Sequence, residues 1–539
     1  MDLRELEGQR RRARELVEKE GLDPYPVEFA IVDKEELDEL AAYEGFPERY
    51  PHWRFGMEYD HQKKRSSYGG MRLYELVLNS SPALAYLRED NTAVQNKAVM
   101  VHVYAHADFF AHNKWYKGTG KSGIKMMRDH AERIESYMES EGVEAVESFV
   151  DKVLSLKMTI DQYGPFLQRR TERGDEGGEG NEEGNKIPVK RDYMDRFVNP
   201  PEKAEQGGKD LKGRQGSKTG EEVQLPTSDL LGFLGREGKL EEWQREILAA
   251  LREESYYFAP QMMTKVMNEG WAAYWQSKIM SERGFAKDSE FLDHADMQSR
   301  VLGSGGLNPY MLGKRIWEDV KERWDKGRHG REWENCRDRE KRKNWDREEE
   351  RGREKIFEVR SNLNDVSFLD RFFTREVFQE MNLFTYEWVQ GSGQYHITSK
   401  DFEPVKRKLL FQFTNMGRPT IKVQTGNFEN RGELLLVHEF NGVNLHLGDA
   451  RRVLKNVYSL WGKPVNLKTV REKSGRITQI GFKERDPFRR RSAPEKQREG
   501  LLLRCAGSEI EEKKLDLAQV EELIFDSVDY DTVPDSWRS

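Results

Sequence analysis

The sequence predicts an α+β protein in which a large, mainly α-helical N-terminal domain is followed by a smaller ferredoxin-like domain. Two observations indicate this class. Apolar residues recur at helical spacing through most of residues 1–382. Strand-type alternation then appears in Phe384–Val389, and the elements that follow have the order β-α-β-β-α-β, which is that of a split βαβ unit.

The predicted helices of the N-terminal domain have recognisable starts. Thr92 followed by Gln95 is typical of a capping box, which opens a long apolar helix through Asn113. Pro260 suits the first turn of a helix that carries Glu269, because its missing N–H is not needed there. The other predicted helices are Glu5–Lys19, Val143–Ile160, Leu240–Tyr257, Phe285–Leu302, Leu312–Trp324 and Phe368–Met381.

Turn residues separate the predicted elements of the ferredoxin-like domain. Gly391 and Gly393 lie between Phe384–Val389 and Tyr395–Thr398, which predicts a β-hairpin. The remaining predicted elements are the helix Phe402–Phe413, the strands Thr420–Thr425 and Glu433–Phe440, the helix Gly448–Trp461 and the strand Val465–Val470.

Composition divides the chain into five predicted segments. Residues 171–227 are rich in Gly, Glu and Lys and cannot bury enough apolar surface to offset their ordering entropy, so we expect a flexible insertion. Within it, residues 187–200 either dock back on the core or are plain linker. Residues 326–355 interleave Arg with Glu, which is typical of a solvated helix. The segments are the first half of the helical domain (1–170), the insertion (171–227), the second half of the helical domain with the charged helix (228–382), the ferredoxin-like domain (383–484) and a polar tail (485–539).

The overall composition limits the classes of function. The chain has 539 residues and a formal net charge of −7, so we expect a folded protein with no general basic surface for nucleic acid. No apolar run approaches the ~18 residues that cross a bilayer, and no hydrophobic leader follows Met1, so we expect a cytoplasmic protein without a membrane span. Cys336 and Cys505 are the two cysteines, which excludes a cysteine-based zinc site and leaves His, Asp and Glu as metal ligands.

Two distant segments carry polar residues in strongly apolar surroundings. His102 and His106 lie four residues apart on a predicted helix, so they share a face and can bind one metal ion, which Glu269 from a second helix could complete. Unpaired buried polar groups cost roughly 1 to 3 kcal/mol each, so this cluster needs partners, water or a metal. Three interpretations remain open: a metal site, histidines that hydrogen-bond to buried carboxylates, and a metal-free pocket. His294, beside Asp293 and Asp296, is an alternative ligand.

Several long strings of the chain resemble the stage V sporulation protein R (SpoVR) family. They are His102–Phe110, Tyr257–Ala272, Asn308–Tyr310, Lys355–Arg360 and Leu460–Val465. The family takes its name from a role in assembling the spore cortex, a peptidoglycan layer. The resemblance therefore implies a role in spore-cortex, cell-envelope or stress-response pathways. It also implies two partners, a PrkA-type serine protein kinase and a von Willebrand A-like protein, but no settled reaction.

A second resemblance concerns the metal motif alone. Asn268-Glu269-Gly270-Trp271-Ala272 is similar to the string that supplies the third zinc ligand of gluzincin metallopeptidases. The first gluzincin motif matches poorly, because Val103 stands where the general-base glutamate should be. Glu75 or Asp108 could replace that base. The hypothesis is a metal-dependent hydrolase, with zinc or another divalent metal, and the alternative is a non-catalytic adaptor for the two partners.

A glycine-rich stretch offers no nucleotide site. The sequence Gly118-x-Gly120-Lys121-Ser122-Gly123 lacks the full spacing of a phosphate loop and the strand that should precede it. We therefore expect a loop that ends a helix, and no nucleotide cofactor.

Overall fold

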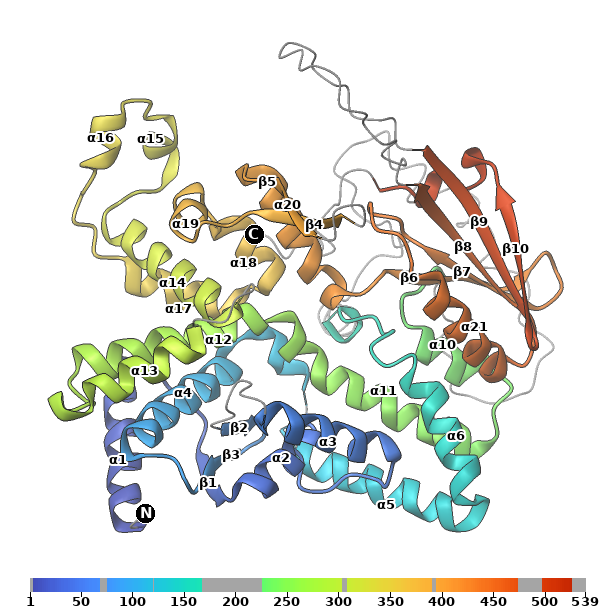
Figure 1. Cartoon of the computed structure of the whole chain (residues 1–539), viewed down its shortest axis with the longest axis horizontal. Helices are drawn as coiled ribbons and strands as arrows, with labels where there is room; N and C mark the ends of the chain where they lie inside the picture. The colour runs from blue at the N-terminus through green and yellow to red at the C-terminus, as the bar shows by residue number, and fades with distance from the viewer. Residues whose placement is uncertain are drawn as a thin grey trace, which may run out of the picture. The chain divides into compact units, whose positions relative to one another are not determined.

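The computed structural model describes residues 3–67, 75–119, 121–166, 225–302, 308–389, 394–473 and 497–525 (Figure 1). The described residues up to Gln162 and from Pro226 onward form one compact unit. Residues 171–224 of the predicted insertion, with the segment 187–200, lie outside the described residues. Within the described residues, no helix combines the length and the apolar character that a membrane crossing requires.

The first part of the compact unit is mainly helical, as predicted, but it also contains a small sheet that the sequence analysis missed. Strand β3 lies between β1, which is parallel to it, and β2, which is antiparallel. These strands have only four to six residues, too few for a clear periodic pattern. The elements are α1 (Leu3–Lys19), β1 (Val27–Val32), α2 (Lys34–Ala42), α3 (Trp53–Ser67), β2 (Glu75–Leu78), β3 (Ala83–Arg88), α4 (Ala93–His112), the 3-10 turn η1 (Lys114–Gly118), α5 (Gly123–Glu141) and α6 (Val143–Leu154).

Helix α4 is the buried centre of this region. The predicted capping box is present: Gln95 donates its backbone N–H to the Thr92 side chain, and Thr92 donates its backbone N–H to the Gln95 side chain. Every residue from Asn96 to Phe110 is buried. A helix that is apolar on most sides packs in the interior, so the polar residues of α4 are held inside the protein.

The second part of the helical region contacts α4. Its elements are α10 (Leu230–Glu237), α11 (Glu242–Met263), α12 (Lys265–Ser277), the π-helical turn η4 (Lys278–Glu282), the 3-10 turn η5 (Asp288–Glu290), α13 (Phe291–Leu302), α14 (Pro309–Asp325), α15 (Gly330–Asn335), α16 (Arg339–Lys343), α17 (Gly352–Asn362), α18 (Asp365–Phe372) and α19 (Arg375–Glu380). The contacts with α4 come from α12, η4, α13 and α17. Pro260 lies near the end of α11 and does not begin a new helix; the helix that carries Glu269 starts after Thr264.

The prediction of one charged helix over residues 326–355 is wrong, because this segment does not form a single helix. Helix α14 ends at Asp325, two short helices follow, and α17 begins at Gly352. Gly327 and Gly330 have φ values of +63° and +77°, a left-handed conformation that interrupts a helix. The charge pattern had indicated a solvated surface but not these breaks.

Helices α12 and α14 cross at two glycines. A Cβ atom on Gly270 would lie 2.4 Å from the Gly313 backbone, and one on Gly313 would lie 2.1 Å from the carbonyl oxygen of Val266. Neither position has room for a side chain. The close approach fixes the place of α12 in the core, next to α4.

The C-terminal part contains two separate sheets. A hairpin of β4 (Thr385–Val389) and β5 (Gln394–Ser399) precedes α20 (Phe402–Phe413) and the 3-10 turn η6 (Thr414–Gly417). The five-stranded sheet has the order β10-β9-β8-β7-β6, and only β7 and β8 are parallel, joined by α21 (Figure 1). Its elements are β6 (Ile421–Phe428), β7 (Glu433–His438), α21 (Leu447–Trp461), β8 (Val465–Lys473), β9 (Gln497–Ala506) and β10 (Glu509–Leu515), followed by the 3-10 turns η7 (Leu517–Gln519) and η8 (Glu521–Leu523).

The α+β class is confirmed, but the ferredoxin-like arrangement is not formed. The first strand of the predicted βαββαβ unit, β5, pairs with β4 in its own sheet, and β8 pairs with β7 and β9. Strand β9 comes from the segment after Arg485 that was predicted as a polar tail. Leu501, Leu503 and Cys505 alternate into the core there, which explains why this polar segment completes the sheet.

Candidate metal centre

Two histidines of α4 face the neighbouring helix α12. His102 and His106 are one helical turn apart, their ring centroids are 4.6 Å apart, and both residues are buried. The ring of His106 also stacks on Phe110, and that of His102 on Tyr310. The interior packing of α4 therefore holds both imidazoles in fixed orientations.

Helix α12 places a carboxylate opposite the two rings. The Oε2 atom of Glu269 is 3.5 Å from Nε2 of His106 and 3.8 Å from Nε2 of His102, and the three candidate ligand atoms all lie within 4.8 Å of one another. These separations exceed the ~2.7–3.2 Å of a hydrogen bond. Two ligands bound to one zinc ion at ~2.0–2.2 Å in tetrahedral geometry lie roughly 3.3–3.6 Å apart. His102, His106 and Glu269 thus converge as predicted; the His106–Glu269 spacing falls in that range, and the His102–Glu269 spacing is slightly longer.

The outer nitrogens of the two rings meet amide side chains. Nδ1 of His102 is 2.8 Å from Oε1 of Gln276, and Nδ1 of His106 is 2.9 Å from Oδ1 of Asn268. On the inner side, Nε2 of His102 and Oε2 of Glu269 are buried without a hydrogen-bond partner among the described residues. Unpartnered buried polar atoms are rare, and a metal ion between them would satisfy both.

Charge and burial shift the pKa values of this cluster. Burial and the neighbouring His102 lower the pKa of His106 to about 4. Burial alone would lower the pKa of His102, but the carboxylates of Glu269 and Glu75 outweigh it and raise that pKa. Burial would raise the pKa of Glu269, but the two histidines outweigh it and lower that pKa. His106 therefore remains neutral near pH 7, as metal binding requires.

Glu75 and Tyr310 lie beside the cluster. Burial raises the pKa of Glu75, with the charge of His102 opposing and that of Glu269 adding to the shift. The charge of Glu269, together with burial and Glu75, raises the pKa of Tyr310 well above its ordinary value. Tyr310 therefore stays protonated. Glu75, at the start of β2, is the sequence-predicted base that does lie near the histidines.

Asp108 does not join the cluster. It follows His106 by two residues, so it lies on another face of α4. Its oxygens accept hydrogen bonds from Arg360, from Nε1 of Trp271 and from the backbone N–H of Asp23. The carboxylate is fully buried and occupied by these partners, so the geometry gives it a packing role, and the alternative base suggested by the sequence is Glu75.

The chain matches two family models along most of its length. The model described as SpoVR like protein matches residues 1–418, and the one described as SpoVR-like C-terminal domain matches residues 419–472. The chain belongs to the SpoVR family. A similar protein is the uncharacterized protein YcgB of Escherichia coli (strain K12), 28% identical over 490 residues, which is 84% of this chain and 89% of that protein. No solved structure matches the chain.

In this SpoVR protein, α12 is held by a residue that the sequence analysis missed. Asp365 accepts hydrogen bonds from the backbone N–H groups of Val266 (2.8 Å) and Met267 (2.9 Å), at the first turn of α12. Burial raises the pKa of Asp365 to about 7 despite these bonds. In the sequence, Asp365 looks like an ordinary residue at the start of a helix, because an apolar stretch follows it. It also lies about a hundred residues after Glu269. Nothing in the local sequence could have connected the two.

Gln276 and Tyr310 of the SpoVR chain also lie beside the site, and Tyr310 was missed as its neighbour. Gln276 lies seven residues after Glu269, two turns along the same helix face, which is a signal that spacing alone contains. His294, the alternative ligand, is buried on α13 but is not part of the cluster. His438 is buried against Thr469 in the five-stranded sheet.

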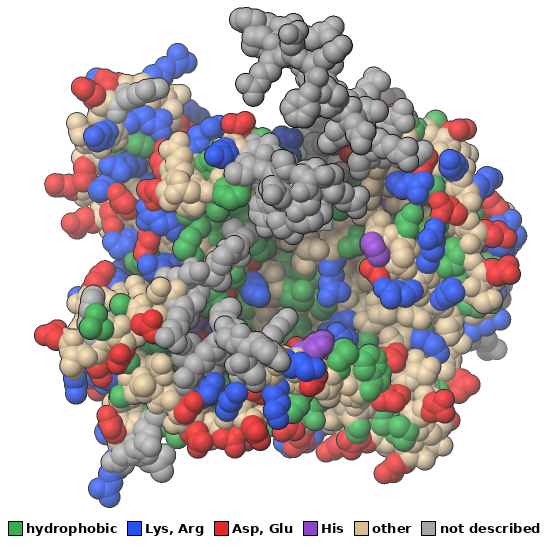
Figure 2. Space-filling view, in the orientation of Figure 1, with side chains coloured by type: hydrophobic (Ala, Val, Ile, Leu, Met, Phe, Trp, Pro, Cys, Tyr) green, Lys and Arg blue, Asp and Glu red, His purple; other side chains and the backbone are tan. Residues whose placement is uncertain are grey.

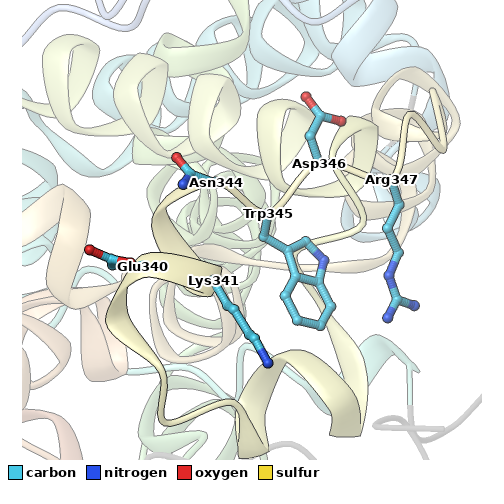
Figure 3. Close-up of a pocket in the computed structure, with 6 residues that line it drawn as sticks. All are labelled: Glu340, Lys341, Asn344, Trp345, Asp346 and Arg347. Atoms are coloured by element: carbon cyan, nitrogen blue, oxygen red, sulfur yellow. The ribbon is translucent and has the colours of Figure 1, made fainter.

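A hollow outside the candidate centre has a different character. It is an open depression of about 490 Å³, lined by Glu340, Lys341, Asn344, Trp345, Asp346 and Arg347. Figure 3 shows the Trp345 ring between the Lys341 and Arg347 side chains, with Asp346 directed away from them. The lining is solvent-exposed and of mixed charge, like the interspersed red and blue side chains of Figure 2. It lacks the buried, convergent ligand atoms of the histidine cluster.

Proposed function

We propose that this SpoVR protein binds one divalent metal ion, with zinc as the first candidate. It acts as a metal-dependent hydrolase in a cell-envelope, spore-cortex or stress-response pathway. The observation that carries the proposal is the convergence of Nε2 of His102, Nε2 of His106 and Oε2 of Glu269 within 4.8 Å. Nε2 of His102 and Oε2 of Glu269 are buried and have no hydrogen-bond partner among the described residues.

The donor set matches the chemistry of a catalytic site. Two imidazoles and one carboxylate are a known ligand set for catalytic zinc, and they leave a position open for substrate. Bound there, the ion would supply Lewis-acid polarisation of a substrate carbonyl. The pathway assignment rests on family membership alone.

The residues around the ligands supply the proton chemistry of the proposal. Val103 removes the usual glutamate base, and Glu75 reaches the same cluster from β2. Burial raises its pKa, which makes this carboxylate a better proton acceptor than an ordinary glutamate. Tyr310, beside Glu269 and stacked on His102, is a neutral hydroxyl able to donate to a substrate oxygen.

Elemental analysis of the purified full chain tests metal binding. After exposure to zinc, iron(II) or manganese(II), we expect close to one ion per chain, lost in His102→Ala and Glu269→Ala. His446→Ala is the matched control, because His446 is an exposed histidine at the start of α21. A wild-type chain that retains none of these ions would overturn the proposal.

The hydrolase part has its own test. The metal-loaded chain is incubated with peptides and with soluble peptidoglycan precursors, and newly released amines are measured. Release that needs the ion and disappears in Glu269→Gln supports hydrolysis. A metal-loaded chain without any such release contradicts it.

Val103 favours a second candidate, because a site without the motif base can hold a metal that is only structural. In that case the protein is a non-catalytic adaptor for a PrkA-type serine kinase and a von Willebrand A-like protein, the partners that the family resemblance implies. Co-purification with those two proteins, unaffected by Glu75→Gln, supports the adaptor.

A further inference from the structure

One helix supplies both a candidate ligand and the partners of the two others. Helix α12 carries Glu269, and it also carries Asn268 and Gln276, whose side-chain oxygens meet the histidine Nδ1 atoms at 2.9 and 2.8 Å. Both distances lie in the range of a strong hydrogen bond. The histidines themselves come from α4. The pairing of these two helices therefore determines the environment of both ring nitrogens of each imidazole.

We propose that Asn268 and Gln276 are positioning residues that hold both imidazoles in the tautomer with the proton on Nδ1 and the lone pair on Nε2. An amide oxygen only accepts hydrogen bonds, so each Nδ1 must donate. In a neutral imidazole the other nitrogen, Nε2, is then the acceptor. Both Nε2 atoms lie toward Oε2 of Glu269, so the lone pairs converge on the centre proposed above. The tautomer assignment stands on these contacts, and its link to metal affinity rests on the proposed function.

The two acceptors are neutral, and this has a chemical consequence. A carboxylate partner would raise the basicity of each imidazole and add negative charge to the site. With amides, a divalent ion held by two neutral imidazoles and one carboxylate keeps a net positive charge. Such an ion attracts an anionic or strongly polarised oxygen, which suits a carbonyl or carboxylate substrate better than a cationic one.

Nitrogen NMR of the metal-free full chain, selectively labelled with 15N-histidine, tests the tautomer directly. In alkaline buffer, where the imidazoles are neutral, we expect the signals of His102 and His106 to report protonated Nδ1 and unprotonated Nε2. The spectra of His102→Gln and His106→Gln assign the two rings. In Gln276→Ala we expect His102 to shift toward the tautomer mixture of a free imidazole, with His106 unchanged. Protonated Nε2 in the wild type would overturn the proposal, whether or not the chain binds metal.

Zinc affinity, measured by competition with a chelator, tests the consequence. Loss of a partner of this kind typically weakens metal binding by about 10–100-fold, so we expect that loss in Asn268→Ala and in Gln276→Ala. Gln276→Glu keeps an acceptor and should recover wild-type affinity or exceed it. Asn466→Ala is the matched control, since Asn466 is a fully buried amide in the five-stranded sheet, bonded to Glu433. Equal affinities of wild type and Gln276→Ala would overturn the positioning role.

The two failures are distinguishable. A wild-type chain that binds no metal but has the Nδ1-protonated tautomers contradicts the proposed function and supports the positioning role. A chain that binds metal equally well in all variants, with mixed tautomers, keeps the proposed function and contradicts the positioning role. Thermal unfolding of each variant shows whether it is folded.

Discussion

Arg360 and Asp108 form a buried ion pair against α4, with Nη1 of Arg360 2.7 Å from each oxygen of Asp108. Arg360 comes from α17, so the pair connects the C-terminal part of α4 to a helix some 250 residues later in the chain. The same carboxylate accepts from Nε1 of Trp271, two residues after Glu269. The ion pair and the Trp271 hydrogen bond thus link α4, α12 and α17, the first two of which carry the candidate ligands.

Removing one member of this pair should destabilise the fold without affecting metal binding chemistry. Asp108→Asn leaves the Arg360 charge buried and uncompensated, for which the expected cost is roughly 3–5 kcal/mol in the free energy of unfolding. Urea denaturation measures that loss. Asp108→Asn combined with Arg360→Met should recover most of it, because neither buried charge remains. If the Asp108→Asn chain is instead as stable as the wild type but no longer binds metal, Asp108 belongs to the metal site.

The glycine crossing of α12 and α14 predicts a second large effect. Gly270→Ala would place a Cβ atom 2.4 Å from the Gly313 backbone, so the helices must separate and Glu269 must move with α12. Overpacking of this kind costs about 1–3 kcal/mol, and backbone contacts relax less easily than side chains. Gly8→Ala on α1 is the matched control, because nothing lies within 4 Å of its Cβ position. That control should be neutral or slightly stabilising, by up to ~1 kcal/mol. Thermal unfolding compares the two, and equal melting temperatures would contradict the packing argument.

The sequence could predict those features of the structure that leave a pattern within a short stretch of residues. His102 and His106 could be paired because one helical turn separates them, and Glu269 could be added because a carboxylate among Met and Trp residues needs a partner. Asp365 could not be found, because its hydrogen bonds to α12 join positions about a hundred residues apart. The same limit applies to Arg360 as the partner of Asp108.

The elements of the fold also divide into those with a short-range sequence pattern and those that depend on tertiary contacts. The capping box at Thr92 predicted the start of α4 because both of its hydrogen bonds form within four residues. Strand β9 escaped prediction because its apolar residues lie in a polar segment, and its pairing with β8 is a tertiary contact. The ferredoxin-like arrangement was wrong for a related reason: element order does not determine which strands become neighbours, and β9 lies where the pattern had no strand.

Asp365 predicts a pH dependence of stability. Its pKa is about 7 in the folded chain against 3.8 in the unfolded one, so the folded chain binds more protons between these values. Its contribution to stability is therefore fully present below about pH 4 and is lost as the pH rises through 7. Asp365→Asn removes this titration, so the slope of unfolding free energy against pH should become less negative between pH 4 and 7. Urea denaturation at several pH values measures the slope, and an unchanged slope would exclude Asp365 as its source.

Glu433 predicts the opposite dependence in the five-stranded sheet. It accepts hydrogen bonds from Arg504, Arg431 and Asn466, and these bonds lower its pKa to about 2. A lowered carboxyl pKa stabilises the fold above the unfolded value of 4.5, and this contribution is lost as the pH falls from 4.5 toward 2. Glu433→Gln should lower the free energy of unfolding by about 2 kcal/mol at pH 7, with little difference from wild type near pH 2. Denaturation curves at the two pH values give this comparison, and an equal deficit at both would show that packing rather than charge is responsible.

The Glu75→Gln variant distinguishes two possible roles of Glu75, that of a general base and that of a fourth metal ligand. It is near enough to His102 and Glu269 for their charges to affect its pKa, but it is not among the three residues whose ligand atoms lie within 4.8 Å of one another. As a base, it can be replaced by an amide of the same size without loss of the ion. Glu75→Gln should therefore keep about one ion per chain and lose the hydrolytic activity, whereas Glu269→Gln should lose both. Elemental analysis and the amine-release assay on the same preparations decide this. Loss of the ion from Glu75→Gln, with His446→Ala unaffected, would make Glu75 a ligand and close the site to substrate.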